Sequence, residues 1–115
     1  MKTKIFHNPQ CSKSRQTLAL LLDKGIKPEI IDYLKTPPDR KALQNILKML
    51  GMKPIDLIRK REALYKELEL GKHADNTQML LDVMIENPIL IERPIVISNN
   101  KAVIGRPPEL VLDII

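Results

Sequence analysis

The sequence predicts an α/β protein in which a βαβ unit comes first, helices follow, and a ββα unit closes the chain. Two changes in the spacing of apolar residues support this. A short apolar run at Ile5–Phe6 gives way to leucines at helical spacing, and from Pro94 short β-branched runs replace the helical pattern. A chain of 115 residues suits one domain with one core. We therefore expect a single domain over residues 1–115, with a helical insertion at about residues 36–88.

The N-terminal part has the pattern of a strand, a helix and a second strand. Ile5 and Phe6 indicate the first strand. The helix is indicated by leucines three and four positions apart before Gly25, namely Leu18, Leu21 and Leu22. The second strand is Glu29–Tyr33, and the crossover before it predicts parallel pairing with the first strand.

The middle of the chain has the pattern of several helices. Thr36 is the expected N-cap of the first helix, with Pro37 at its first position and Gly51 at its end. Further helical stretches are expected at Ile55–Lys60, at Ala63–Leu68, and from a capping sequence at Asp75–Gln78 to Asn87–Pro88.

The C-terminal part returns to strands. Ile95–Ile97 and Ala102–Ile104 are expected to form a buried antiparallel hairpin through Asn99–Asn100, because Asn tolerates the positive φ of a tight turn. A last helix follows the prolines at 107–108, with Leu110, Val111 and Ile114 expected to face inward. This order of elements predicts a thioredoxin-like fold, with a mixed four-stranded sheet and a helical insertion.

The composition argues against several classes of function. Aromatic residues make up 3% of the chain, too few for stacking on nucleic acid bases. No signal peptide and no run of about 18 apolar residues is present, so we expect a cytoplasmic protein without a membrane partner. Two His and one Cys make a metal site unexpected. The net charge of +5 is compatible with an anionic partner, although the basic residues are scattered along the chain.

Cys11, the only cysteine, lies where the first strand gives way to the first helix. The unpaired N–H groups and the dipole of a helix N-terminus favour negative charge. Together with Ser12, Lys13 and Arg15, they predict an anion-binding loop and a thiol pKa below the ordinary value. The alternative is a buried structural cysteine. The polar, turn-forming neighbours of Cys11 argue against it.

Three arginines lie at the expected ends of elements: Arg59, Arg93 and Arg106. A guanidinium group can bind an oxyanion through two parallel hydrogen bonds, and several converging arginines would neutralise charge as it develops. For each arginine alone, a solvated surface charge remains an equal alternative.

Four motifs resemble the glutaredoxin-coupled arsenate reductase family, in family order and at family spacing: His7–Leu18, Leu57–Lys60, Glu92–Val96 and Gly105–Glu109. The resemblance covers essentially the whole chain. It implies that Cys11 is the catalytic nucleophile and that Arg59, Arg93 and Arg106 bind and stabilise the oxyanion.

The resemblance also implies a cis peptide before Pro94, a hydrogen bond from His7 that helps hold the thiolate, and a second one from the Ser14 hydroxyl. It implies arsenate or a related oxyanion as substrate, glutathione as co-substrate, glutaredoxin as reductant and no bound cofactor. We expect a monomer. The sequence ends at Ile115, where better-known arsenate reductases continue, so it is more similar to a shorter branch of the family.

Two alternatives to arsenate reduction remain open. One is a glutathione-dependent thiol transferase that lacks arsenate specificity, since a glutathionyl substrate also carries anionic groups. The other is a non-enzymatic regulator of the kind that binds RNA polymerase and senses oxidation. We expect no nucleic acid as a partner. Such regulators commonly use a C-x-x-C pair, and Ser14 occupies the second position of that pair here.

Overall fold

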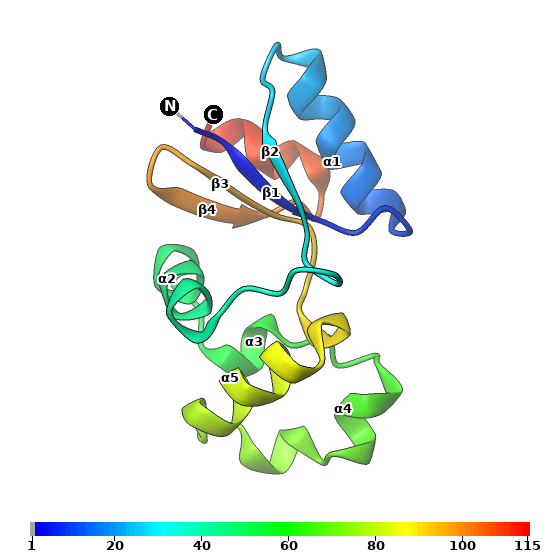
Figure 1. The fold of residues 1–115 in the computed structure, drawn as a ribbon, viewed down its shortest axis with the longest axis vertical. Helices are drawn as coiled ribbons and strands as arrows, with labels where there is room; N and C mark the ends of the chain where they lie inside the picture. The colour runs from blue at the N-terminus through cyan, green and yellow to red at the C-terminus, as the bar shows by residue number, and fades with distance from the viewer. Residues whose placement is uncertain (1) are drawn as a thin grey trace. The chain divides into compact units, whose positions relative to one another are not determined.

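The computed structural model describes residues 2–115 and divides into two compact units (Figure 1). The first unit contains the residues up to Thr36 together with Arg93–Ile115. The second unit is Pro37–Glu92, and all its regular elements are helical.

The first unit is built on a four-stranded sheet with the strand order β2-β1-β3-β4. β1 pairs with β2 in parallel, whereas β3 pairs antiparallel with both β1 and β4. This mixed sheet confirms the predicted thioredoxin-like α/β fold. The elements of the unit are β1 Lys4–His7, α1 Ser12–Asp23, β2 Glu29–Asp32, β3 Ile95–Ser98, β4 Lys101–Ile104 and the 3-10 helix η3 Pro108–Asp113.

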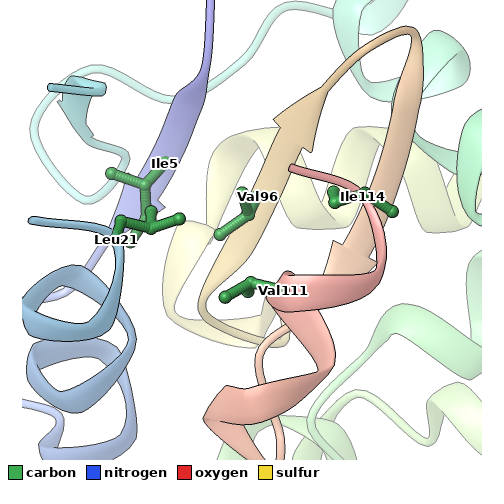
Figure 2. Close-up of a cluster of buried hydrophobic side chains, with 5 residues drawn as sticks. All are labelled: Ile5, Leu21, Val96, Val111 and Ile114. Atoms are coloured by element: carbon green, nitrogen blue, oxygen red, sulfur yellow. The ribbon is translucent and has the colours of Figure 1, made fainter. Parts of the chain in front are cut away.

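The core of the first unit lies between one face of this sheet and the helices α1 and η3 (Figure 2). Ile5 and Val96 are paired across β1 and β3 and are fully buried. Leu21 of α1 packs against them, as do Val111 of η3 and Ile114, which directly follows η3. Residues three apart eclipse each other in a 3-10 helix, so Val111 and Ile114 point the same way. The sheet and α1 are thereby fixed relative to each other.

Two leucines of the predicted helices are exposed, and one of them, Leu110, was expected to face inward. Leu22 is 52% exposed and Leu110 is 37% exposed. The buried side of α1 consists of Ser14, Thr17 and Leu21, so polar residues continue the stripe towards the N-terminus of the helix. In the 3-10 geometry, Val111 and Ile114 lie on the same buried side because they are three residues apart. Leu110 precedes Val111 by one residue and therefore faces solvent.

The hairpin between β3 and β4 confirms the predicted turn. Asn99 and Asn100 have φ values of 55° and 61°, as expected for its two central residues. The expectation that both strands are buried was wrong for β4. Lys101 is exposed and the other residues of β4 are half-buried, because this strand lies at the edge of the sheet.

The second unit contains α2 Arg40–Leu50, α3 Pro54–Leu57, α4 Ala63–Glu67, η1 Leu70–His73, α5 Thr77–Glu86 and η2 Pro88–Leu90. Its first helix begins later than expected. Asp39, not Thr36, is the N-cap, and its side chain accepts a hydrogen bond of 2.8 Å from the N–H of Ala42. Pro38 explains the difference, because a proline holds the residue before it, here Pro37, out of the helical region.

The helical stretch expected at Ile55–Lys60 ends at Leu57. Ile58 leaves the helix to form a β-bridge with Ile91. The N–H of Arg59 then donates to the carbonyl of Leu90 at 2.7 Å. Arg59 therefore lies in extended chain, where a pairing with a distant segment has overridden the local helical pattern.

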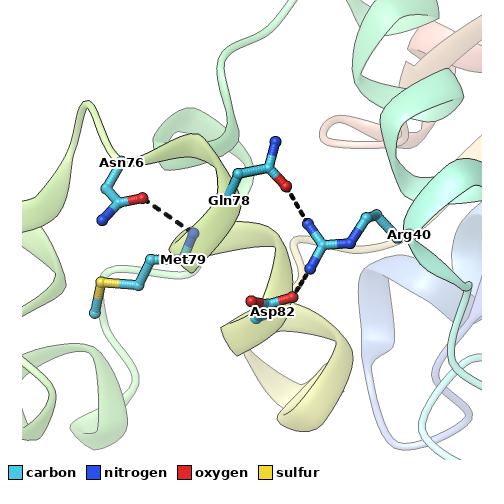
Figure 3. Close-up of polar contacts among 5 residues, drawn as sticks. All are labelled: Arg40, Asn76, Gln78, Met79 and Asp82. Carbon is cyan, nitrogen blue, oxygen red and sulfur yellow. Dashed lines mark hydrogen bonds and ion pairs between the residues drawn. The ribbon is translucent and has the colours of Figure 1, made fainter.

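Polar contacts join α2 to α5 (Figure 3). The guanidinium of Arg40 donates to Gln78 and pairs with Asp82. Asn76 caps α5 by accepting a hydrogen bond of 3.2 Å from the N–H of Met79. The Arg40–Asp82 pair is partly exposed, so we expect it to contribute less than about 1 kcal/mol to the stability of this unit.

Candidate active site

Cys11 is the N-cap of α1, which confirms that the cysteine lies at a strand-to-helix turn. Its backbone is extended, its N–H donates to the carbonyl of Asn8 at 3.0 Å, and its own carbonyl accepts from Arg15 at 3.0 Å. Only 8% of the residue is exposed. The sulfur is therefore placed beside the first N–H groups of the helix and largely shielded from water.

Side-chain hydrogen bonds hold the loop that leads to Cys11. The Asn8 side chain accepts from the N–H of Gln10 at 2.9 Å, a local turn that Asn commonly forms. The N–H of Asn8 donates to the Ser14 hydroxyl at 3.0 Å, and the Arg15 guanidinium donates to the carbonyl of Pro9 at 2.8 Å. Both bonds tie the loop to the first turn of α1.

The surroundings of Cys11 favour the thiolate. Burial raises the pKa of the thiol, but it is outweighed by the backbone N–H of Ser14, the positive charge of Arg93, the backbone N–H of Lys13 and a hydrogen bond from the Arg93 side chain. The net result is a Cys11 pKa below the ordinary value of a cysteine. The predicted direction of the shift is thus the one that the structure supports.

The origin of the positive charge differs from the sequence-based prediction. Lys13 contributes through its backbone N–H, and Arg15 is turned towards the carbonyl of Pro9. The guanidinium beside the sulfur belongs to Arg93, which directly follows the helical segment of the chain. Ser12 is exposed at the first position of α1. Backbone geometry thus explains the loop's effect on Cys11 better than its side-chain charges do.

His7 and Ser14 form a buried pair next to the cysteine loop. The His7 Nδ1 atom and the Ser14 hydroxyl are 2.6 Å apart. The hydroxyl is thus engaged by His7 and Asn8, and Ser14 reaches the thiolate through its backbone N–H rather than through its side chain as expected. Burial lowers the pKa of His7 most strongly. The carboxylate of Asp32, which is paired with His7 across β1 and β2, raises this pKa, and the charge of Arg15 lowers it. The net result is a His7 pKa below the ordinary value of a histidine. His7 is therefore neutral at pH 7 and orients Ser14 as a hydrogen-bonding partner.

The segments 93–94 and 105–106 lie together in the first unit. The Arg93–Pro94 peptide is cis, which confirms the expectation, and the Arg106–Pro107 peptide is also cis. The N–H of Gly105 donates to the carbonyl of Pro94 at 2.9 Å, and the Arg106 guanidinium donates to the carbonyl of Arg93 at 3.4 Å. Two of the three predicted arginines are thus brought together, one of them at the sulfur of Cys11.

Arg59 belongs to the second unit. Its guanidinium lies 3.4 Å from the carbonyl of Ile89 and 3.7 Å from the carboxylate of Glu62, and its side chain is 18% exposed. These contacts fix the side chain within its own unit. Its participation in the site of Cys11 stays a prediction.

Residues 2–115 contain no group of three or more His, Cys, Asp or Glu side chains that could hold a metal ion. Over the same described residues, none of the helices has the length and apolar character needed to cross a membrane.

Sequence reasoning missed two residues that shape this site, Thr17 and Gly105. Thr17 is fully buried on α1, although its leucine neighbours carry the apolar pattern. Gly105 opens one of the four motifs, but it was given no role of its own, and it is buried against Thr17 and Pro94. A glycine directly before an arginine at a strand end is the signal that could have indicated a close backbone approach.

Comparison with known proteins shows which family this chain is similar to. The family model described as ArsC family matches residues 6–114. The uncharacterized protein YfgD of Escherichia coli is 51% identical over 115 residues, covering 99% of this chain and 97% of that protein. A protein named arsenate reductase in Haemophilus influenzae is 47% identical over 116 residues, covering 100% of both chains. The solved structure of an arsenate reductase from Vibrio cholerae matches with a TM-score of 0.95 and 48% identity, covering 100% of this chain and 98% of that one.

Proposed function

Because this chain belongs to the ArsC family, we propose that it is an arsenate reductase in which the thiolate of Cys11 attacks arsenate. Related proteins of the same length carry the name arsenate reductase, including one that this chain covers from end to end. Two findings support the proposal: the similarity to these proteins, and a site at Cys11 whose chemistry suits an oxyanion.

One observation carries the proposal. Cys11 caps a helix N-terminus, where two backbone N–H groups and the Arg93 guanidinium hold its pKa below the ordinary value. A thiolate is the reactive form of cysteine, and the groups that stabilise it also bind an oxyanion. Nucleophile and anion site are then provided by one loop.

In the first step, the Cys11 sulfur forms a bond to the arsenic(V) atom of arsenate. An arsenic–oxygen bond breaks, and its oxygen leaves as water after taking up a proton. Arg93 and Arg106 are adjacent through the hydrogen bond between them, and both guanidinium groups serve to bind the oxyanion. We assign Arg59 to the same task as a third arginine. Lys13 and Ser14 bind the anion through their backbone N–H groups.

In the second step, an external thiol must complete the reduction, because Cys11 is the only cysteine of the chain. We assign this role to glutathione. Its thiolate attacks the Cys11 sulfur, the sulfur–arsenic bond breaks, and the electron pair stays on arsenic, which leaves as arsenite. The products are arsenic(III) and a mixed disulfide between Cys11 and glutathione. Glutaredoxin then reduces this disulfide by thiol–disulfide exchange and restores the Cys11 thiolate. This cycle suits a reducing cytoplasm.

The test is NADPH oxidation driven by arsenate in the presence of glutathione, glutaredoxin and glutathione reductase. The wild-type protein should support turnover. Cys11→Ser should abolish it, because a serine hydroxyl is far less acidic and forms no mixed disulfide, while circular dichroism should show an unchanged fold. Turnover by Cys11→Ser would refute the assignment of the nucleophile. With glutaredoxin left out, NADPH oxidation that depends on this protein and on a glutathione mixed disulfide, with none driven by arsenate in the full assay, would instead identify a thiol transferase.

A further inference from the structure

Gly105 occupies a place in the first unit that has no room for a side chain. A Cβ atom built on it would lie 2.6 Å from the Thr17 hydroxyl oxygen, 3.0 Å from the Thr17 methyl and 3.0 Å from the Pro94 ring. Ordinary contacts of a Cβ atom lie at 3.4–4 Å. The backbone at Gly105 is therefore held between α1 and the segment that begins at Arg93.

Thr17 is the part of α1 that meets Gly105. It is fully buried, and its hydroxyl donates to the carbonyl of Lys13 at 2.8 Å. The same hydroxyl lies 3.4 Å from the carbonyl of Gly105. Thr17 follows Ser14 and Lys13 by one turn, and these are the residues whose N–H groups face the Cys11 sulfur. Through Thr17, the turn that holds the thiolate is in direct contact with Gly105.

Gly105 is in turn linked to the arginines. Its N–H donates to the carbonyl of Pro94 at 2.9 Å, and Arg106 next to it donates to the carbonyl of Arg93 at 3.4 Å. Arg93 then reaches back to the Cys11 sulfur through its charge and a hydrogen bond. The contacts therefore connect Thr17 of α1 to Gly105, Gly105 to the segment with Arg93, and Arg93 to Cys11 at the N-terminus of α1.

We propose that Gly105 and Thr17 are positioning residues, whose contact sets how closely Arg93 and Arg106 approach Cys11. Neither side chain reaches the reacting atoms in this role. The inference deepens the proposed function, on which it rests for the identity of the oxyanion. At the observed spacing between α1 and the segments 93–94 and 105–106, residue 105 has no room for a Cβ atom, so only glycine fits there.

Gly105→Ala should widen this spacing. The added methyl group must move by several tenths of an ångström from Thr17, and the segment with Pro94 and both arginines moves with it. The pKa of Cys11 should then rise, because the Arg93 charge and hydrogen bond weaken while burial still opposes the thiolate. Binding of an oxyanion should weaken about tenfold or more, as expected when a hydrogen bond between charged groups is lost.

The experiment follows the rate of Cys11 alkylation against pH, without and with inorganic sulfate or arsenate, in the full chain. Three variants accompany the wild type: Gly105→Ala, Thr17→Ala combined with Gly105→Ala, and Ser98→Ala. In the double variant two of the three atoms nearest to the new methyl group are removed, the hydroxyl oxygen and the methyl of Thr17, while the Pro94 ring stays. The pKa and the protection by anion should therefore return most of the way to the wild-type values. Ser98 is buried against Thr3 in the same unit, and its loss is a control for general destabilisation.

The expected result is a higher thiol pKa and weaker anion protection in Gly105→Ala, recovery in the double variant, and neither change in Ser98→Ala. An unchanged pKa and unchanged protection in folded Gly105→Ala would overturn the inference, and so would equal effects in Ser98→Ala. If Gly105→Ala fails to fold, Thr17→Val places a methyl group against Gly105 from the other side and should shift both quantities in the same direction. Neither readout needs turnover, so a protein that fails to reduce arsenate but shows these shifts would refute only the proposed function.

Discussion

Arg93 is the residue whose removal should change the chemistry of Cys11 most. Its guanidinium acts on the thiolate in two ways, through its charge and through a hydrogen bond. In Arg93→Ala both are lost, while the N–H groups of Ser14 and Lys13 remain and burial still disfavours the charge. The pKa of Cys11 should therefore rise towards the ordinary value of a cysteine, and alkylation at neutral pH should slow.

The effect on turnover comes from the loss of one charged hydrogen-bond donor to the oxyanion. A hydrogen bond to a charged group contributes about 1.5–3 kcal/mol, and about 1.4 kcal/mol corresponds to a tenfold change in affinity. Losing one donor that stabilises developing negative charge lowers the rate by about 10²–10³. With one guanidinium removed and that of Arg106 retained, kcat/KM for arsenate should fall by about 10²–10³.

Arg15→Ala is the matched control, because it removes the same charged side chain from a position close to Cys11, in the first turn of α1. The Arg15 guanidinium is exposed and bonded to the carbonyl of Pro9, so its loss should have a much smaller effect on both the thiol pKa and kcat/KM. The assay is the glutaredoxin-coupled oxidation of NADPH, together with the pH dependence of alkylation. Equal losses in Arg15→Ala and Arg93→Ala, or an unchanged thiol pKa in Arg93→Ala, would refute the assignment of the charge to Arg93.

Two further predictions concern stability. Leu21→Ala should lower the free energy of unfolding by about 2–5 kcal/mol in urea titration, because it leaves a cavity beside Ile5 and Val96; a loss below about 1 kcal/mol would contradict the core described above. The folded protein holds the pKa of His7 below 6.5, so the unfolded chain binds more protons as pH falls through that value and the wild type loses stability there. His7→Gln should not show this loss, and the stability difference between the two proteins should therefore change as pH falls through about 6.5; a constant difference would refute the assignment.

The position of Cys11 could be predicted from sequence because only local patterns determine it. The strand at Ile5–Phe6, the leucines of the helix and the polar residues between them place the cysteine at the N-terminus of α1, where the structure has it. The hairpin was predictable for a similar reason, since Asn99 and Asn100 suit the backbone that the turn requires.

The source of the charge at Cys11 could not be predicted in this way. Lys13 and Arg15 are close to the cysteine in sequence, but Arg93 reaches it through the pairing of β1 with β3. Likewise, Thr17 looks unremarkable inside a leucine pattern, and its burial follows from the approach of Gly105. Such contacts depend on tertiary structure, on which helical spacing carries no information.

Local competition explains the errors in helix boundaries. Thr36 and Asp39 are both acceptable N-caps, and the proline pair between them decides for Asp39. Leu110 fits an α-helical stripe, but the last helix is a 3-10 helix and buries Val111 with Ile114 instead. At the first helix of the second unit, two N-caps were compatible with the sequence. At the last helix, both α-helical and 3-10 spacing were compatible with it. The backbone conformation of the folded chain decides between them in each case.

The central claim is that Cys11 is a thiolate at an oxyanion site, and the rate of its alkylation against pH tests this most directly. We predict a midpoint below the ordinary value of a cysteine, and slower alkylation when arsenate occupies the loop. A midpoint at or above about 8.5, with no protection by arsenate, would contradict the account and indicate a structural cysteine.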